Sequence, residues 1–122
     1  MMTALETARA AFSTVASLAS CKIGLEANIS PADYPLVRIV PSRVTPGRPY
    51  GGRTVECLVY FGAHTTQAEG GLEAVYASLF DLEDQLLQKL RQLQGRYLET
   101  VTDEDRLDHG FKLMAIRCEL LG

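Results

Sequence analysis

Two histidines are the first residues to consider for chemistry, because histidine titrates near neutral pH and binds metals. His64 follows an apolar run that ends at Phe61, and His109 lies in an acidic segment. A catalytic or metal-binding histidine needs partner residues at set spacings. The sequence contains no HxxxH, HxH or CxxC pattern. We therefore interpret both histidines as loop residues and predict no catalytic and no metal-binding residue.

Four carboxylates crowd one short segment near the C-terminal end: Asp103, Glu104, Asp105 and Asp108. A calcium-binding loop requires oxygen ligands at alternate positions, a glycine at its sixth position and a closing glutamate. That pattern is absent. The segment is therefore either a solvated turn or an acidic patch that faces a basic partner surface.

The glycine pair Gly51-Gly52, followed by Arg53-Thr54, suggests phosphate binding only weakly. A Walker loop has the pattern GxxxxGK[ST] and leads from a strand into a helix. Here the lysine is missing and the following residues have the composition of a strand. Serines and cysteines have no histidine or carboxylate at a spacing known for activated nucleophiles. Catalysis thus has no positive support, and we predict no cofactor.

Three cysteines, an odd number with wide spacing, form neither a disulfide framework nor a zinc pattern. They are Cys21, Cys57 and Cys118. We predict small buried thiols in a reducing compartment.

The remaining chemistry-bearing residues lie on a predicted hairpin, Pro35–His64. Its strands are Leu36–Val44 and Arg53–Phe61, which are rich in β-branched and aromatic residues. The connection Thr45–Gly52 is longer than the two to five residues of a tight hairpin. A long loop on a rigid hairpin is a common place for function. We therefore select the arginines and the tyrosine in or next to this loop as candidate partner contacts: Arg43, Arg48, Tyr50 and Arg53.

Other segments complete the predicted fold. Helical periodicity predicts helices from Thr3 to about Ser20 and over Gly71–Gln94, with Gly95 as the terminating residue. Alternation predicts a short edge strand in Cys21–Asn28 and strands at Arg96–Thr102 and from Phe111 to the C-terminal end. Pro41 places its strand at a sheet edge or at a bulge, because proline donates no ladder hydrogen bond.

This order predicts one domain, residues 1–122, of the α+β class. Its sheet is mixed and mostly antiparallel, with four to five strands, and both helices cover one face. The other face would hold Leu58, Tyr60, Leu113 and Ala115. Such a face is too apolar to be only solvated, so either loops cover it or the protein self-associates.

Composition limits the possible functions. Of 122 residues, 47% are hydrophobic and 22% are charged, as in ordinary globular domains. The formal net charge of −3 argues against binding nucleic acid by neutralising its backbone. No apolar run approaches 18 residues, and no basic segment precedes an apolar one at the N-terminal end. We therefore predict no transmembrane helix and no signal peptide.

The element order, together with Ala32-Asp33-Tyr34-Pro35-Leu36-Val37 and the strand Glu56–Phe61, resembles the tail terminator proteins of long-tailed bacteriophages. These form the lambda-like minor tail protein family. The resemblance implies a hexameric ring that caps the tail tube, stops its polymerisation and joins it to the head connector. The expected partners are further copies of the chain, the tail tube protein and the connector or neck protein. The expected locations are the virion tail and, during assembly, the host cytoplasm.

The family implies no catalytic residues, and its long inter-strand loop orders on assembly. That loop corresponds here to Val44–Arg53. We expect Asp103, Asp105 and Asp108 to be its acidic counterpart on the next protomer, with simple solvent exposure of both patches as the alternative. DNA would at most pass through the ring lumen. Two other functions stay open: a neck or head–tail joining protein, and a small ligand-binding domain or enzyme that uses His64 and the glycine-rich loop.

Overall fold

The computed structural model describes residues 2–26, 29–46, 53–64, 71–102, 105–106 and 111–121. Its elements, in chain order, are α1 (Met2–Phe12), β1 (Ser20–Ile23), the short 3-10 helix η1 (Pro31–Asp33), β2 (Leu36–Pro46), β3 (Arg53–His64), α2 (Gly71–Gln92), β4 (Arg96–Val101), β5 (Asp105–Arg106) and β6 (Phe111–Leu121).

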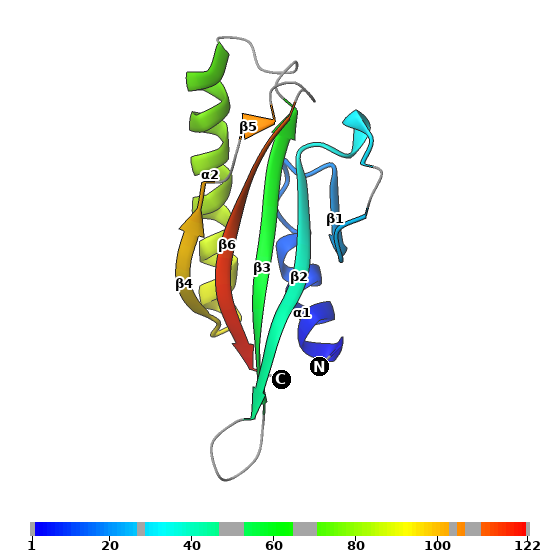
Figure 1. Ribbon diagram of the computed structural model, residues 1–122, viewed down its shortest axis with the longest axis vertical. Coiled ribbons are helices and arrows are strands. Elements are labelled where there is room, and N and C mark those ends of the chain that lie inside the picture. Colours follow the sequence, from blue (N-terminus) through cyan, green and yellow to red (C-terminus); the bar gives the residue numbers. More distant parts are fainter. Residues whose placement is uncertain are drawn as a thin grey trace.

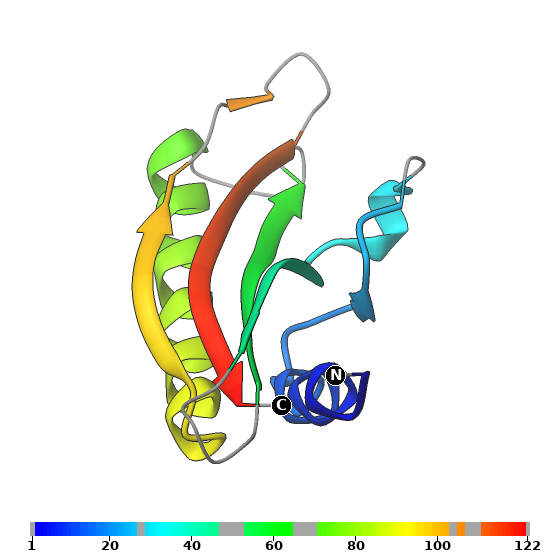
Figure 2. The same ribbon diagram turned by 60° about the horizontal axis from the view of Figure 1, so that its bottom comes forward.

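The strands form one mixed sheet in the order β1-β2-β3-β6-β4, and the two-residue β5 pairs with β6 beside this path. The β1–β2 pair is parallel, and the other pairs are antiparallel. Both α-helices lie behind the sheet in the view of Figure 1. In the turned view of Figure 2, α2 runs along β4 and β6. The predicted α+β class, with both helices on one face of a mostly antiparallel sheet, is confirmed.

The core lies between the helices and one face of the sheet. Alternate residues of the central strands point into it, because side chains alternate between the two faces of a strand. On β3 and β6 these residues are Val55, Cys57, Val59, Phe61, Met114, Ile116, Cys118 and Leu120, all at most 5% exposed. The helices contribute Leu5, Ala8, Phe12, Val75, Leu79, Leu82, Leu86 and Leu90.

The first helix is shorter than predicted, since it ends at Phe12 rather than near Ser20. The hydroxyl of Ser13 donates to the Arg9 carbonyl at 2.6 Å, and that of Thr14 donates to the Ala11 carbonyl at 2.6 Å. Such hydroxyls compete with the helical backbone bonds. Val15 is nevertheless buried, as its apolar spacing predicted, because the chain turns back over the core there.

The residue with the left-handed conformation at the end of the long helix is not the predicted Gly95. Gln94, not Gly95, has the left-handed conformation, with φ of 59°. The Gly95 N–H donates to the Leu90 carbonyl at 3.0 Å and that of Gln94 to the Arg91 carbonyl at 3.0 Å, which is the Schellman pattern. Gly95 serves for close approach, since a Cβ there would collide with the Leu90 side chain and lie 3.2 Å from Leu120.

The hairpin of β2 and β3 has the predicted irregularity. Pairing shifts between Pro41 and Arg43, so the strand is bulged there, and β1 pairs only with Leu36–Ile39, which leaves the rest of β2 at the sheet edge. Both strands extend further than predicted: β2 ends at Pro46 rather than Val44, and β3 ends at His64 rather than Phe61. Because β3 begins at Arg53, as predicted, the connection comprises residues 47–52.

Candidate interaction surfaces

The far end of the β2–β3 hairpin projects beyond the rest of the molecule (Figure 1). We define the hairpin arm as Pro41–Pro46 of β2 and Arg53–Thr54 of β3. All six residues of its β2 part are exposed, whereas Leu36–Ile39 of the same strand are buried. Inside the arm, the hydroxyls of Thr45 and Thr54 lie 2.6 Å apart across the two strands. Thr54 also pairs with Leu121 of β6, and Val44 pairs with the core residue Val55, so the arm adjoins the sheet and only the Pro46–Arg53 pair lies beyond the β6 ladder.

The arm has two chemically different faces. Val44 pairs with the buried Val55, and Pro46 pairs with Arg53, two residues from Val55. Val44 and Arg53 therefore lie on the helix-side face of the ribbon, where Val44 is 47% exposed. Arg43, paired with Glu56, lies on the opposite face. The bulge after Pro41 thus separates two of the predicted contact residues, Arg43 and Arg53.

A charged network crosses the sheet face opposite the helices, next to the arm. Arg117 donates to Glu56 at 2.6 Å and to Glu99 at 2.7 Å, linking three strands. Arg96 lies 3.7 Å from Glu119 on the same face. The hydrogen bond from Arg117 holds the pKa of Glu56 below its ordinary value, and the charge of Arg43 acts in the same direction. These charges bind one another, so they are not simply solvated.

The other end of this face is covered by the segment that follows β1. Leu36 and Arg38 are completely buried there. The Arg38 guanidinium donates to Glu26 at 2.6 Å, to the Ser20 hydroxyl at 3.0 Å and to the Val37 carbonyl at 2.9 Å. In the middle of the face, Leu58, Tyr60 and Leu113 are half-buried and Ala115 is buried. The chain itself therefore covers part of the face that was predicted to be apolar, which was one of the two predicted alternatives.

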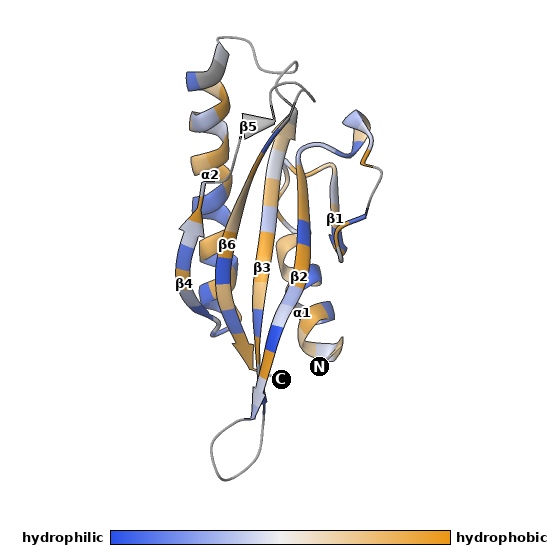
Figure 3. Ribbon diagram, in the orientation of Figure 1, coloured by the Kyte–Doolittle hydropathy of each residue, from blue (hydrophilic) through white to orange (hydrophobic). Residues whose placement is uncertain are grey.

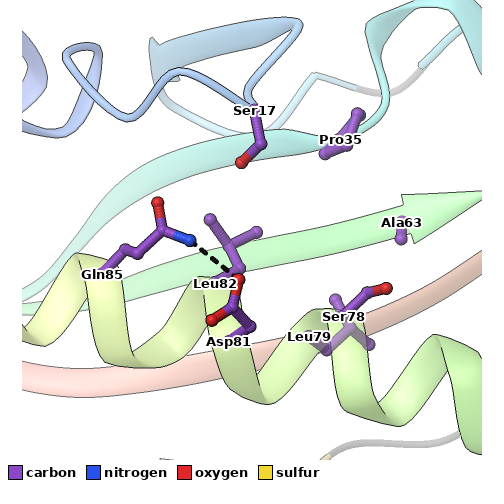
Figure 4. Close-up of a pocket in the computed structure, with 8 residues that line it drawn as sticks. All are labelled: Ser17, Pro35, Ala63, Ser78, Leu79, Asp81, Leu82 and Gln85. Atoms are coloured by element: carbon purple, nitrogen blue, oxygen red, sulfur yellow. Dashed lines mark hydrogen bonds between the residues drawn. The ribbon is translucent and has the colours of Figure 1, made fainter.

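A groove of about 230 Å³ lies between α2 and the turn after α1 (Figure 4). We call it the α2 groove. Its apolar lining is Pro35, Ala63, Leu79 and Leu82, and its polar lining is Ser17, Ser78, Asp81 and Gln85. The Gln85 amide donates to the Asp81 carboxylate at 3.0 Å. This groove was not predicted from the sequence, because its residues come from four separate segments and form no motif.

The arm and the predicted acidic counterpart lie at opposite ends of the sheet. Asp105 pairs with Lys112 in the short β5–β6 ladder, and Lys112 pairs with Ala63 near the far end of β3. The arm lies at the opposite end of β3, which begins at Arg53. The arm and the predicted acidic counterpart therefore do not meet within one chain. Arg48, Tyr50, Asp103 and Asp108, predicted with them as contacts, lie outside the described residues.

The cysteines match the predicted buried thiols at two positions. Cys57 and Cys118 are fully buried and pair directly across β3 and β6, and Cys21 is half-buried. Burial raises the pKa of the Cys57 thiol to about 11 and that of Cys118 to about 12, so both stay protonated at neutral pH. Thiols of this kind are poor nucleophiles.

In the described part of the chain, no group of three or more His, Cys, Asp or Glu residues is placed to hold a metal ion. His64 is the last residue of β3. Within the same described ranges, the helices are too short or too polar to cross a bilayer. No family model matches the chain, and no curated protein matches it significantly.

Proposed function

We propose that this protein is a structural ring protein of a bacteriophage, which caps the tail tube, stops its polymerisation and joins it to the head connector. One observation carries the proposal most directly. The hairpin arm exposes Arg43, Val44 and Arg53, and none of its side chains belongs to the buried core. The observed order of helices and strands is also the predicted order on which the resemblance to tail terminators rests.

Physical chemistry supports an assembly role for such an arm. An exposed two-stranded ribbon is marginally stable by itself and gains stability by packing on a partner. Arginines bind carboxylates through forked, charge-assisted hydrogen bonds, which give specificity as well as energy. The chain as a whole is acidic, with a formal net charge of −3, so another copy is a suitable partner for a basic arm. Repeated contacts between unlike surfaces close into rings when the rotation between neighbouring copies permits.

Electron microscopy and light scattering of the purified protein test the ring. We expect six-fold rings whose population rises with concentration, and binding of these rings to the ends of isolated tail tubes. A protein that stays monomeric at high concentration and does not bind tubes would contradict the proposal.

The place of the ring in the virion separates this function from that of a neck or head–tail joining protein. Labelled protein in intact virions should be found at the head-proximal end of the tail tube. Label at the capsid portal alone would exclude the terminator function and favour the neck.

A ligand-binding or enzymatic function predicts a different result. A broad thermal-shift screen should then find a stabilising small molecule, and His64→Ala or Arg48→Ala should abolish that stabilisation. A screen that finds no stabilising compound would count against this function.

A further inference from the structure

The helix-side face of the arm and the α2 groove are far apart in one molecule. Arg53 begins β3, and the groove residue Ala63 lies ten residues later on the same strand (63 − 53 = 10). At about 3.3 Å per residue, the separation is roughly 33 Å. Figure 1 shows the arm extending away from the rest of the sheet. The arm of one molecule therefore does not reach its own groove.

The two surfaces nevertheless match in chemistry. The arm face presents two exposed apolar residues, Val44 and Pro46, beside the exposed cation Arg53, and Val44 is 47% exposed. The groove has a floor of the buried Leu79 and Leu82, and the exposed carboxylate of Asp81 lies on its lining. An apolar side chain on the floor and an arginine on the carboxylate would satisfy both surfaces at once.

We propose that the arm of one copy of this chain docks in the α2 groove of a second copy, with Val44 against Leu79 and Leu82, and Arg53 paired with Asp81. This deepens the proposed function, on which it rests, by naming the two surfaces that join neighbouring protomers. The contact is head-to-tail, because the arm and the groove are different surfaces. Head-to-tail contacts continue from one copy to the next and close into a ring when the rotation permits.

Charge reversal tests this contact. Arg53→Glu places a carboxylate against Asp81, and Asp81→Arg places a cation against Arg53. Each variant alone should weaken self-association by about tenfold or more, because it replaces attraction by repulsion at the contact. Mixed in equal amounts, the two variants should assemble again, since each arm then meets a groove of opposite charge. The mixed assembly should alternate the two variants.

Two matched variants control for the change in net charge. Arg91→Glu reverses an exposed cation of α2, and Asp84→Arg reverses an exposed anion of α2, and neither residue lines the groove. Both controls should assemble like the wild type. Circular dichroism and urea unfolding should show that all four variants fold, because every changed residue is exposed.

Sedimentation velocity of each variant and of the mixture gives three decisive outcomes. Loss in each single variant with recovery in the mixture supports the contact. The contact would be overturned if Arg53→Glu and Asp81→Arg assembled like the wild type. It would also be overturned if each variant lost assembly and mixing did not restore it. Either result would leave the proposed ring in place. A wild type that never assembles would overturn both.

Discussion

The two halves of β2 differ sharply in their exposure to solvent. Leu36, Val37, Arg38 and Ile39 are each 0% exposed, whereas every residue from Pro41 to Pro46 is exposed. The contrast also holds across the ladder, since Val44 is 47% exposed and its partner Val55 is 1% exposed. Folding free energy comes mainly from buried apolar surface. The first half therefore stabilises the fold, and the second half needs another explanation, which the proposed assembly would provide.

The largest expected difference between the two regions comes from deleting apolar side chains. Phe61→Ala should lower the free energy of unfolding by about 3–5 kcal/mol, because Phe61 is fully buried and leaves a cavity. Val44→Ala should lower it by less than about 0.5 kcal/mol, because the side chain contacts solvent. Urea unfolding followed by circular dichroism measures both. Similar losses for the two variants would show that the arm belongs to the core after all.

A polar contact at the buried end of β2 should have the next largest effect. Glu26→Gln should destabilise the protein by about 1–2 kcal/mol, because the fully buried Arg38 guanidinium then loses the charge that balances it. The Glu26 side chain is 33% exposed, which limits the loss. Arg38→Met, which removes the buried charge itself, should cost less than Glu26→Gln. A larger loss in Arg38→Met would mean that the ion pair is a net source of stability.

The sequence was sufficient to predict the main elements, because apolar spacing reports burial directly. Alternation on β3 and β6 and the leucine spacing of α2 indicated which side chains face the core. It failed where a local contact decided the outcome. Helix α1 ends at Phe12, where the hydroxyls of Ser13 and Thr14 bond back to the Arg9 and Ala11 carbonyls. Gln94 rather than Gly95 has the left-handed conformation, and Gly95 lies against Leu90 and Leu120 instead.

The candidate surfaces were less predictable than the fold. Arg43 and Arg53 were correctly placed on the hairpin, but their separation onto opposite faces depends on the position of the bulge between Pro41 and Arg43. The α2 groove combines Ser17, Pro35 and Ala63 with one side of α2. Such residues meet only after the chain has folded, and their types have no chemical signature. Sequence spacing therefore contained no signal for the groove.

The charged network beside the arm predicts a pH dependence. The pKa of Glu56 is lowered in the folded protein, so its contribution to stability is present above its ordinary value of 4.5 and disappears as the pH falls through the lowered value. In Arg117→Gln most of this contribution should be absent, because only the charge of Arg43 then still lowers the pKa of Glu56. The stability difference between wild type and variant should therefore be largest near neutral pH and shrink towards pH 3. A difference that stays constant down to pH 3 would show that Arg117 acts through packing alone.

The smallest expected effect on stability comes from the arm cations. Arg48→Glu combined with Arg53→Glu should change the free energy of unfolding by less than about 0.5 kcal/mol, because Arg53 is exposed and surface substitutions rarely cost more. The same double variant should assemble poorly, since Arg53→Glu places a repulsive charge on the surface that we propose to join protomers. Unfolding of the variant would instead make the arm part of the fold. Intact folding with lost assembly would separate the two roles of β2 at its bulge: burial before it, and recognition after it.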